Sequence, residues 1–156
     1  MASSPYVTAE GYALLNQELT ERWARRRDVV KALSAAAAEG DRSENAEYIY
    51  RKKELREIDR RIRYLQKRLP DLKVVDQAPD NQSQIFFAAW VTVETEAGDE
   101  KEYRIVGPDE IDASKGYISI DSPLARQLLG KTLDDEVVIE VAGQKKVYFV
   151  LAIRYS

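Results

Sequence analysis

Two carboxylates and a hydroxyl lie close together in a short polar segment, "GDRSENAEY", at residues 40–48. Asp41 and Glu44 are three residues apart, and Ser43 lies between them. Two carboxylates can bind a hard cation such as Mg²⁺, but Mg²⁺ requires six oxygen ligands and this pair supplies only some of them. The segment therefore indicates an incomplete metal site, to which a partner molecule would add the remaining ligands.

The same residues also fit a purely structural role. The string Asp41-Arg42-Ser43-Glu44 matches the capping box, in which an N-cap acceptor is followed three residues later by glutamate. Acidic side chains also suit the positive end of a helix dipole. Spacing alone favours the capping role, and the metal-binding role stays open beside it.

The composition of this 156-residue chain restricts its chemistry. The chain has no cysteine, which excludes disulfides and thiolate metal sites, and no histidine, the side chain best suited to proton transfer near neutral pH. Any chemistry therefore depends on carboxylates, hydroxyls, amines or a borrowed metal ion. No signal peptide or apolar run of membrane length is present, so we expect a cytoplasmic protein without membrane contact.

Charge is distributed unevenly along the chain. Residues 1–75 carry 16 basic and 12 acidic side chains, whereas residues 76–156 carry 8 and 15. This asymmetry predicts two parts with different partners: nucleic acid for the first, and a basic or mixed protein surface for the second.

Apolar residues on both sides of the polar segment recur at the heptad spacing of a coiled coil. Thr8 can cap the first helix, and Pro70 ends the second. Folding the chain back at Gly40 brings the two apolar seams into register, which predicts an antiparallel helical hairpin with residues 40–48 at its tip. The first seam comprises Tyr12, Leu15, Leu19, Trp23, Val30, Leu33 and Ala37, and the second comprises Tyr48, Arg51, Leu55, Ile58, Ile62, Leu65 and Leu69.

A stripe of basic residues follows the outer face of the second predicted helix, two positions before the seam residues from Leu55 to Leu69. It is either a solvated face with pairs such as Glu57–Arg61 and Asp59–Arg63, or a surface along which a phosphate backbone can lie. The stripe comprises Lys53, Arg56, Arg60, Arg63 and Lys67, and it is widened by Lys52, Arg61 and Arg68.

Beyond residue 84 the apolar residues alternate, which predicts an antiparallel β-sheet. One hairpin turns at Ala97-Gly98-Asp99 and another at Gly143, after which Val147, Phe149, Leu151 and Ile153 should share one face. "DSPLARQLLGK" predicts a short helix with Asp121 or Ser122 as its N-cap. The expected fold class is α+β, with a coiled-coil hairpin at residues 1–76, a linker at 77–84 and a sheet domain at 85–156.

Several long motifs resemble those of the bacterial Gre-type transcript cleavage factors, and the resemblance covers nearly the whole chain. They are "VTAEGYALLNQEL", "GDRSENAEYIYRKKELREIDRRIRYL", "RIVGPDEI" and "YISIDSPLARQLLGK". The tip string followed by a dense basic stripe resembles the GreB branch of that family more than the GreA branch.

The resemblance implies a transcription elongation factor whose C-terminal domain is FKBP-like and docks on bacterial RNA polymerase beside its secondary channel. The coiled coil would enter the channel and stimulate the polymerase's own Mg²⁺-dependent hydrolysis of backtracked nascent RNA, which rescues arrested complexes. Such a factor is not an enzyme by itself. We expect it to be a monomer whose partners are the polymerase and the 3′ end of the nascent RNA.

The resemblance also implies roles for individual residues. Asp41 and Glu44 would hold Mg²⁺ jointly with the polymerase, and Ser43 would orient the attacking water. Asp121, Ser122 and Pro123 match the docking segment, and the RNA-contacting cations would be Lys52, Lys53, Arg56, Arg60, Arg61, Arg63 and Lys67. Two other functions stay open: a non-cleaving inhibitor that occupies the channel, and an FKBP-like prolyl isomerase or chaperone.

Overall fold

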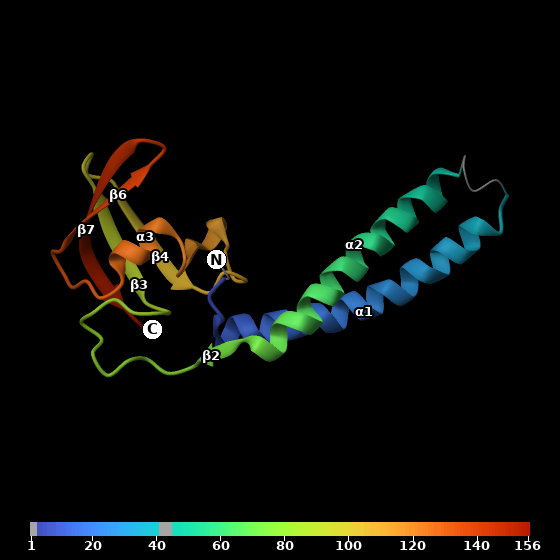
Figure 1. Ribbon diagram of the computed structural model, residues 1–156, viewed down its shortest axis with the longest axis horizontal. Coiled ribbons are helices and arrows are strands. Elements are labelled where there is room, and N and C mark those ends of the chain that lie inside the picture. The colour runs from blue at the N-terminus through green and yellow to red at the C-terminus, as the bar shows by residue number, and fades with distance from the viewer. Residues whose placement is uncertain (1–2, 41–44) are drawn as a thin grey trace. The chain divides into compact units, whose positions relative to one another are not determined.

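The computed structural model describes residues 3–40 and 45–156, and it confirms the α+β fold class (Figure 1). The chain forms two compact units, one of Tyr12–Leu72 and one that joins Met1–Gly11 to Lys73–Ser156. The sequence predicted that residues 1–76 form the hairpin. The structure groups the N-terminal segment with the sheet unit, because β1 (Tyr6–Thr8) pairs in parallel with β2 (Lys73–Val75).

The first unit is the predicted antiparallel helical hairpin. Its helices α1 (Ala9–Ala37) and α2 (Ala46–Arg68) run side by side in opposite directions (Figure 1). The Thr8 hydroxyl accepts a hydrogen bond from the Gly11 N–H at 3.0 Å, which confirms the predicted cap of α1. At the other end, α2 passes into a 3₁₀ turn, η1 (Leu69–Asp71), which contains Pro70.

The predicted seam of α2 is confirmed, whereas that of α1 is wrong in its middle. Trp23 and Val30 are 39% and 36% exposed, and Val29 is buried instead. The heptad repeat of α1 continues through Arg22 and Arg26, which a search for apolar residues passes over. The buried residues of the two seams are Leu15, Val29 and Ala36 on α1, with Ile58, Ile62, Leu65 and Leu69 at the C-terminal end of α2 and in η1.

Ion pairs between the helices accompany these apolar contacts. Arg61 donates two hydrogen bonds to the Glu18 carboxylate, at 2.8 and 2.9 Å. Arg26 bonds Asp59 at 2.6 Å, and Arg25 bonds Glu54 at 2.8 Å. The pairs expected within α2, Glu57–Arg61 and Asp59–Arg63, do not form among the described residues, because Arg61 and Asp59 bond to α1 instead.

The second unit contains a five-stranded sheet in the order β5-β4-β3-β7-β6. Both predicted hairpins are confirmed, but the sheet is mixed, because β5 runs parallel to β4. A short helix, α3, packs its buried Ala125 and Leu128 into the core of the sheet. The elements are β3 (Trp90–Thr95), β4 (Glu100–Val106), η2 (Ala113–Lys115), β5 (Tyr117–Ser119), α3 (Pro123–Leu128), β6 (Glu136–Val141) and β7 (Gln144–Arg154).

A β-bulge in β7 overturns the prediction that its odd-numbered residues share one face. Val93 pairs with Val150 and Thr92 pairs with Ala152, so Leu151 is an extra residue in the ladder. An extra residue reverses the faces of all residues beyond it. Tyr148 and Val150 are therefore buried before the bulge, Ile153 packs against the core after it, and Leu151 is 38% exposed.

Two of the sequence motifs meet at the Glu110 carboxylate. Glu110 accepts hydrogen bonds from the hydroxyl and the N–H of Thr8, the latter at 3.1 Å, and from the Gly107 N–H at 2.7 Å. A Cβ atom on Gly11 would overlap the Glu110 Oε1 atom. The glycines of "VTAEGY" and "RIVGPDEI" thus permit the close approach that attaches β1 to the sheet unit.

We expect Gly11→Ala to destabilise the protein by about 1–3 kcal/mol, because the added methyl group overlaps the Glu110 carboxylate. Chemical denaturation of the full chain measures this free energy of unfolding. Ala13→Ser is the control, since it adds one atom at an exposed position of the same helix and should change stability by less than about 0.5 kcal/mol. Equal stability of Gly11→Ala and the parent would contradict the role assigned to this contact.

The ion pairs of the hairpin predict a loss of helix stability in acid. The hydrogen bonds from Arg61 lower the pKa of Glu18 below its ordinary value of 4.5. A lowered carboxyl pKa stabilises the fold above the ordinary pKa, and this contribution disappears as the pH falls through the folded-state pKa. The melting temperature followed by far-UV circular dichroism should therefore fall as the pH drops below 4.5.

Glu18→Gln should remove part of this pH dependence and cost about 1 kcal/mol at neutral pH, because the charged partner of Arg61 is lost. Glu57→Gln is the matched control: Glu57 is exposed on α2 and has no ion pair among the described residues. The same acid sensitivity in Glu18→Gln and the parent would show that the Glu18–Arg61 pair does not stabilise the hairpin.

Candidate functional site

The base of the hairpin tip is held by one side chain, that of Asn45. Its amide nitrogen donates to the Ala36 carbonyl at 2.8 Å, and its amide oxygen accepts from the Tyr48 N–H at 3.1 Å. Asn45 is therefore the N-cap of α2. The capping role that spacing favoured for Asp41 is performed at α2 by Asn45, since the helix begins at Ala46.

Asn45 also links the end of one helix to the start of the next. The Ala36 carbonyl lies in the last turn of α1, and the Tyr48 N–H lies in the first turn of α2. One amide side chain thus joins the two helices at this end of the hairpin. Asn45 was not among the predicted caps, although asparagine is among the preferred N-cap residues.

The predicted catalytic residues Asp41, Ser43 and Glu44 lie outside the described residues. The residues that the structure does describe contain no group of three or more Asp, Glu, His or Cys side chains that could hold a metal ion. None of the described helices is long and apolar enough to cross a membrane.

The structure brings the five central cations of the basic stripe together on the exposed side of α2. Each is exposed, and none has an ion pair among the described residues. Because like charges three and four residues apart on a helix repel one another, this arrangement favours binding of an anion along the helix. The residues are Lys53, Arg56, Arg60, Arg63 and Lys67. Lys52, beside them, has its ammonium 5.8 Å from the centre of the Tyr48 ring.

Arg61 differs from the other predicted RNA-binding cations. Its side chain is half-buried and its guanidinium donates two hydrogen bonds to Glu18, which in turn accepts one from Arg22. The hydrogen bonds from Arg61 hold the pKa of the Glu18 carboxyl below its ordinary range, so the pair remains ionic at neutral pH. Arg61 therefore connects the helices and is the member of the predicted set least available to a phosphate.

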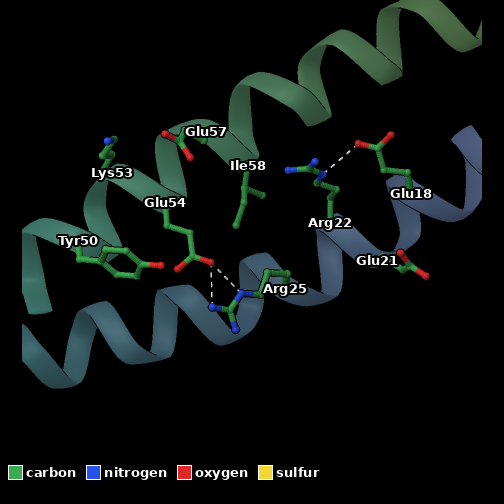
Figure 2. Close-up of a pocket in the computed structure, with 9 residues that line it drawn as sticks. All are labelled: Glu18, Glu21, Arg22, Arg25, Tyr50, Lys53, Glu54, Glu57 and Ile58. Atoms are coloured by element: carbon green, nitrogen blue, oxygen red, sulfur yellow. Dashed lines mark hydrogen bonds and ion pairs between the residues drawn. The ribbon is translucent and has the colours of Figure 1, made fainter. Parts of the chain in front are cut away.

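An open cleft of about 520 Å³ lies between the two helices near this ion-pair network (Figure 2). Its polar side chains largely satisfy one another: Arg25 bonds Glu54, and Arg22 bonds Glu18. Burial raises the pKa of Glu54, but hydrogen bonds from Arg25 and Arg51 outweigh it and lower the pKa overall. The lining residues are Glu18, Glu21, Arg22, Arg25, Tyr50, Lys53, Glu54, Glu57 and Ile58. We interpret the cleft as a consequence of polar residues at the helix interface.

The predicted docking residues lie at the turn between β5 and α3. Asp121 accepts hydrogen bonds from the N–H of Ser4, at 2.9 Å, and from its hydroxyl. Ser122 is the N-cap of α3, where its hydroxyl accepts from the Ala125 N–H at 3.2 Å. Pro123 follows as the first residue of α3 and is exposed. Two of the three residues thus shape the turn that presents the third.

Comparisons with known proteins match both halves of the chain. Residues 5–74 match the family described as "Transcription elongation factor, N-terminal", and residues 79–155 match "Transcription elongation factor, GreA/GreB, C-term". The chain is 54% identical over 156 residues to transcription elongation factor GreB of Yersinia pestis, covering 99% of this chain and 91% of that protein. It is 56% identical over 155 residues to GreB of Pseudomonas aeruginosa, with 99% and 92% covered.

Among solved structures, the crystal structure of a GreA factor homolog of Thermus thermophilus matches with 24% identity and a TM-score of 0.44, over 96% of this chain and 97% of that one. The two family matches together span nearly all of this chain, and the GreB sequences align with it almost from end to end. The chain therefore belongs to the GreA/GreB family of transcription elongation factors and resembles the GreB proteins in particular.

Proposed function

We propose that this elongation factor inserts its hairpin into the secondary channel of bacterial RNA polymerase and stimulates the polymerase's hydrolysis of backtracked RNA. In this proposal the factor is an accessory that supplies side chains to the active centre of the polymerase. Asp41 and Glu44 would contribute ligands, and Ser43 would help to orient the attacking water.

The observation that carries the proposal is the cap of α2. The main alternative for the tip acids was a capping role, and Asn45 already performs that role with a hydrogen bond to the Tyr48 N–H. Asp41 and Glu44 are therefore not required at the N-cap of this helix. Because the cap does not use these two carboxylates, they are available for a role in chemistry.

The donor chemistry of the tip fits a shared Mg²⁺ ion. Carboxylate oxygens are ligands that Mg²⁺ prefers, and two carboxylates leave an octahedral ion short of ligands, which the polymerase would supply. A bound Mg²⁺ ion lowers the pKa of a coordinated water and thereby favours hydrolysis. The residues of this chain would retain the ion and orient the water, and the chain holds no complete site of its own among the described residues.

The exposed cations of α2 support a contact with the extruded RNA. Lys53, Arg56, Arg60, Arg63 and Lys67 have no ion pair among the described residues, so a phosphate backbone would meet cations without displacing an acid. The sheet unit would dock on the polymerase through the turn at Asp121-Ser122-Pro123, where Pro123 is exposed. Docking would raise the effective concentration of the hairpin at the channel.

The tip proposal predicts that Asp41→Asn and Glu44→Gln each leave helicity and melting temperature nearly unchanged, because Asn45 supplies the cap. Each substitution should reduce transcript cleavage on the order of 10²-fold or more, because a charged metal ligand is lost. The measurement is the cleavage rate of labelled RNA in a stalled, backtracked complex, together with polymerase binding, which should be intact. Raising the Mg²⁺ concentration should restore part of the rate.

Asn45→Ala is the matched control for the tip. It should lower the stability of the hairpin by about 1 kcal/mol, because the cap and the link to Ala36 are lost. This variant separates damage to the fold from damage to the chemistry. If Asp41→Asn and Glu44→Gln both cleave at the rate of the parent, the proposed role of the acids is incorrect.

The stripe predicts a defect that depends on the length of extruded RNA. Replacing Arg56, Arg60 and Arg63 together with glutamine should weaken cleavage of extensively backtracked transcripts more than of briefly backtracked ones, since only longer RNA reaches far along α2. The defect should deepen as salt is raised, as phosphate contacts do. Cleavage rates on both substrates over a salt series measure it.

Arg61→Gln is the control for the loss of positive charge. It removes one cation from α2, but this cation bonds α1 and is the least available to a phosphate. This variant should lower the melting temperature and affect both substrates alike. An equal loss on both substrates in the triple variant would mean that the stripe serves general binding or folding.

A further inference from the structure

Trp23 has an indole ring on the surface of the hairpin, outside the buried seam between the helices. The side chain is 39% exposed, although the ring is large and apolar. Its neighbours Arg22 and Arg26 occupy the helix interface, so Trp23 lies on the flank of the seam. Leu14 and Val30 of the same helix are exposed as well, so the charges around the indole, and not its exposure alone, indicate what could bind it.

Two contacts of Arg26 show where the ring lies relative to α2. The Arg26 guanidinium carbon lies 6.0 Å from the centre of the indole ring, and Arg26 bonds Asp59 of α2 at 2.6 Å. Arg56 and Arg63 lie three residues before and four residues after Asp59, and therefore share its face of α2. The indole is thus on the side of the hairpin that presents these two cations.

Cations of α1 complete the surroundings of the ring. Arg27 and Lys31 follow Trp23 by four and eight residues, so they lie along the same side of α1. Both are exposed, and neither has an ion pair among the described residues. The indole therefore lies on a side of the hairpin that presents cations from both helices, and these cations have no ion pair in the part of the chain that the structure describes.

We propose that Trp23, Arg27, Lys31, Arg56 and Arg63 form a binding surface for single-stranded RNA, in which one base stacks on the indole and phosphates contact the cations. The inference rests on the proposed function and deepens it, because it adds a contact to a base and extends the RNA site onto α1. Aromatic platforms combined with cations are the general means of holding single-stranded nucleic acid without sequence preference.

The surface combines an exposed indole with several cations. A polyanion with planar bases can contact both. A protein partner would need a dense acidic patch around an apolar pocket to match the same charges. RNA supplies a phosphate with every base, and its bases are free to stack once the strand is unpaired. The surface therefore favours RNA over a protein partner.

The test measures binding of the full-length free protein to two labelled strands by fluorescence anisotropy. One is a single-stranded RNA of mixed sequence, and the other is an abasic strand of equal length that keeps the phosphates and lacks the bases. Trp23→Ala should weaken binding of the RNA about tenfold, the order expected for one stacked base, and leave binding of the abasic strand unchanged. Trp23→Phe should restore much of the affinity, because it keeps an aromatic face.

Tyr50→Ala is the matched control, since Tyr50 is an exposed aromatic residue of the hairpin with an arginine, Arg51, 5.3 Å from its ring centre. It should bind both strands like the parent. Arg56→Gln should weaken both strands and flatten the salt dependence, which Trp23→Ala should not change. Circular dichroism melting of each variant shows that the hairpin is folded at the assay temperature.

Three results would overturn the inference: no preference of the parent for RNA over the abasic strand, an equal loss of both strands in Trp23→Ala, or no loss of either. Because the assay contains no polymerase, its failure is independent of the tip chemistry, which the cleavage assay with Asp41→Asn and Glu44→Gln tests separately.

Discussion

The pairing of acidic residues of α2 with arginines of α1 is the interaction on which the hairpin depends. Glu54 and Asp59 of α2 both bond arginines across the interface, at 2.8 and 2.6 Å. A basic helix normally neutralises itself with its own acids at neighbouring turns. Here Glu54 and Asp59 bond α1, so these two acids do not neutralise the outer cations of α2. The bonds that hold the helices together therefore contribute to the positive outer face of the hairpin.

Much of the fold could be predicted because it follows regular periods and local caps. The heptads, the strand alternation, and the caps Thr8 and Ser122 are encoded by residues close in sequence. The errors in predicting buried faces arise where one residue changes the phase of the apolar pattern. Leu151 is an extra residue in β7 and reverses the faces beyond it, and nothing in an alternating pattern marks such a bulge. Trp23 looked like a seam residue because its charged neighbour Arg26 was excluded on polarity, yet Asp59 satisfies that charge.

The parts of the candidate site that depend on nearby residues could also be predicted from the sequence, whereas the parts that depend on distant residues could not. The spacing of the basic stripe was sufficient to place its cations on one exposed face of α2. The different role of Arg61 could not be predicted, because its partner Glu18 is 43 residues away in the sequence. Spacing favoured Asp41 as the cap of α2 because the capping-box pattern lies there, whereas the bond of Asn45 to the Ala36 carbonyl requires the folded hairpin.

The arrangement at the tip has a consequence for where hydrolysis could occur. In the proposed mechanism the tip offers two carboxylates, and the rest of the described chain adds no cluster that could complete a metal site. Two carboxylates hold Mg²⁺ weakly, because most of its ligands must then come from water or another molecule. Hydrolysis would therefore be confined to a partner that supplies the missing ligands. The Asn45 link between the two helices would then matter for chemistry as well as stability, because a ligand pair shared with another protein must be presented from a fixed base.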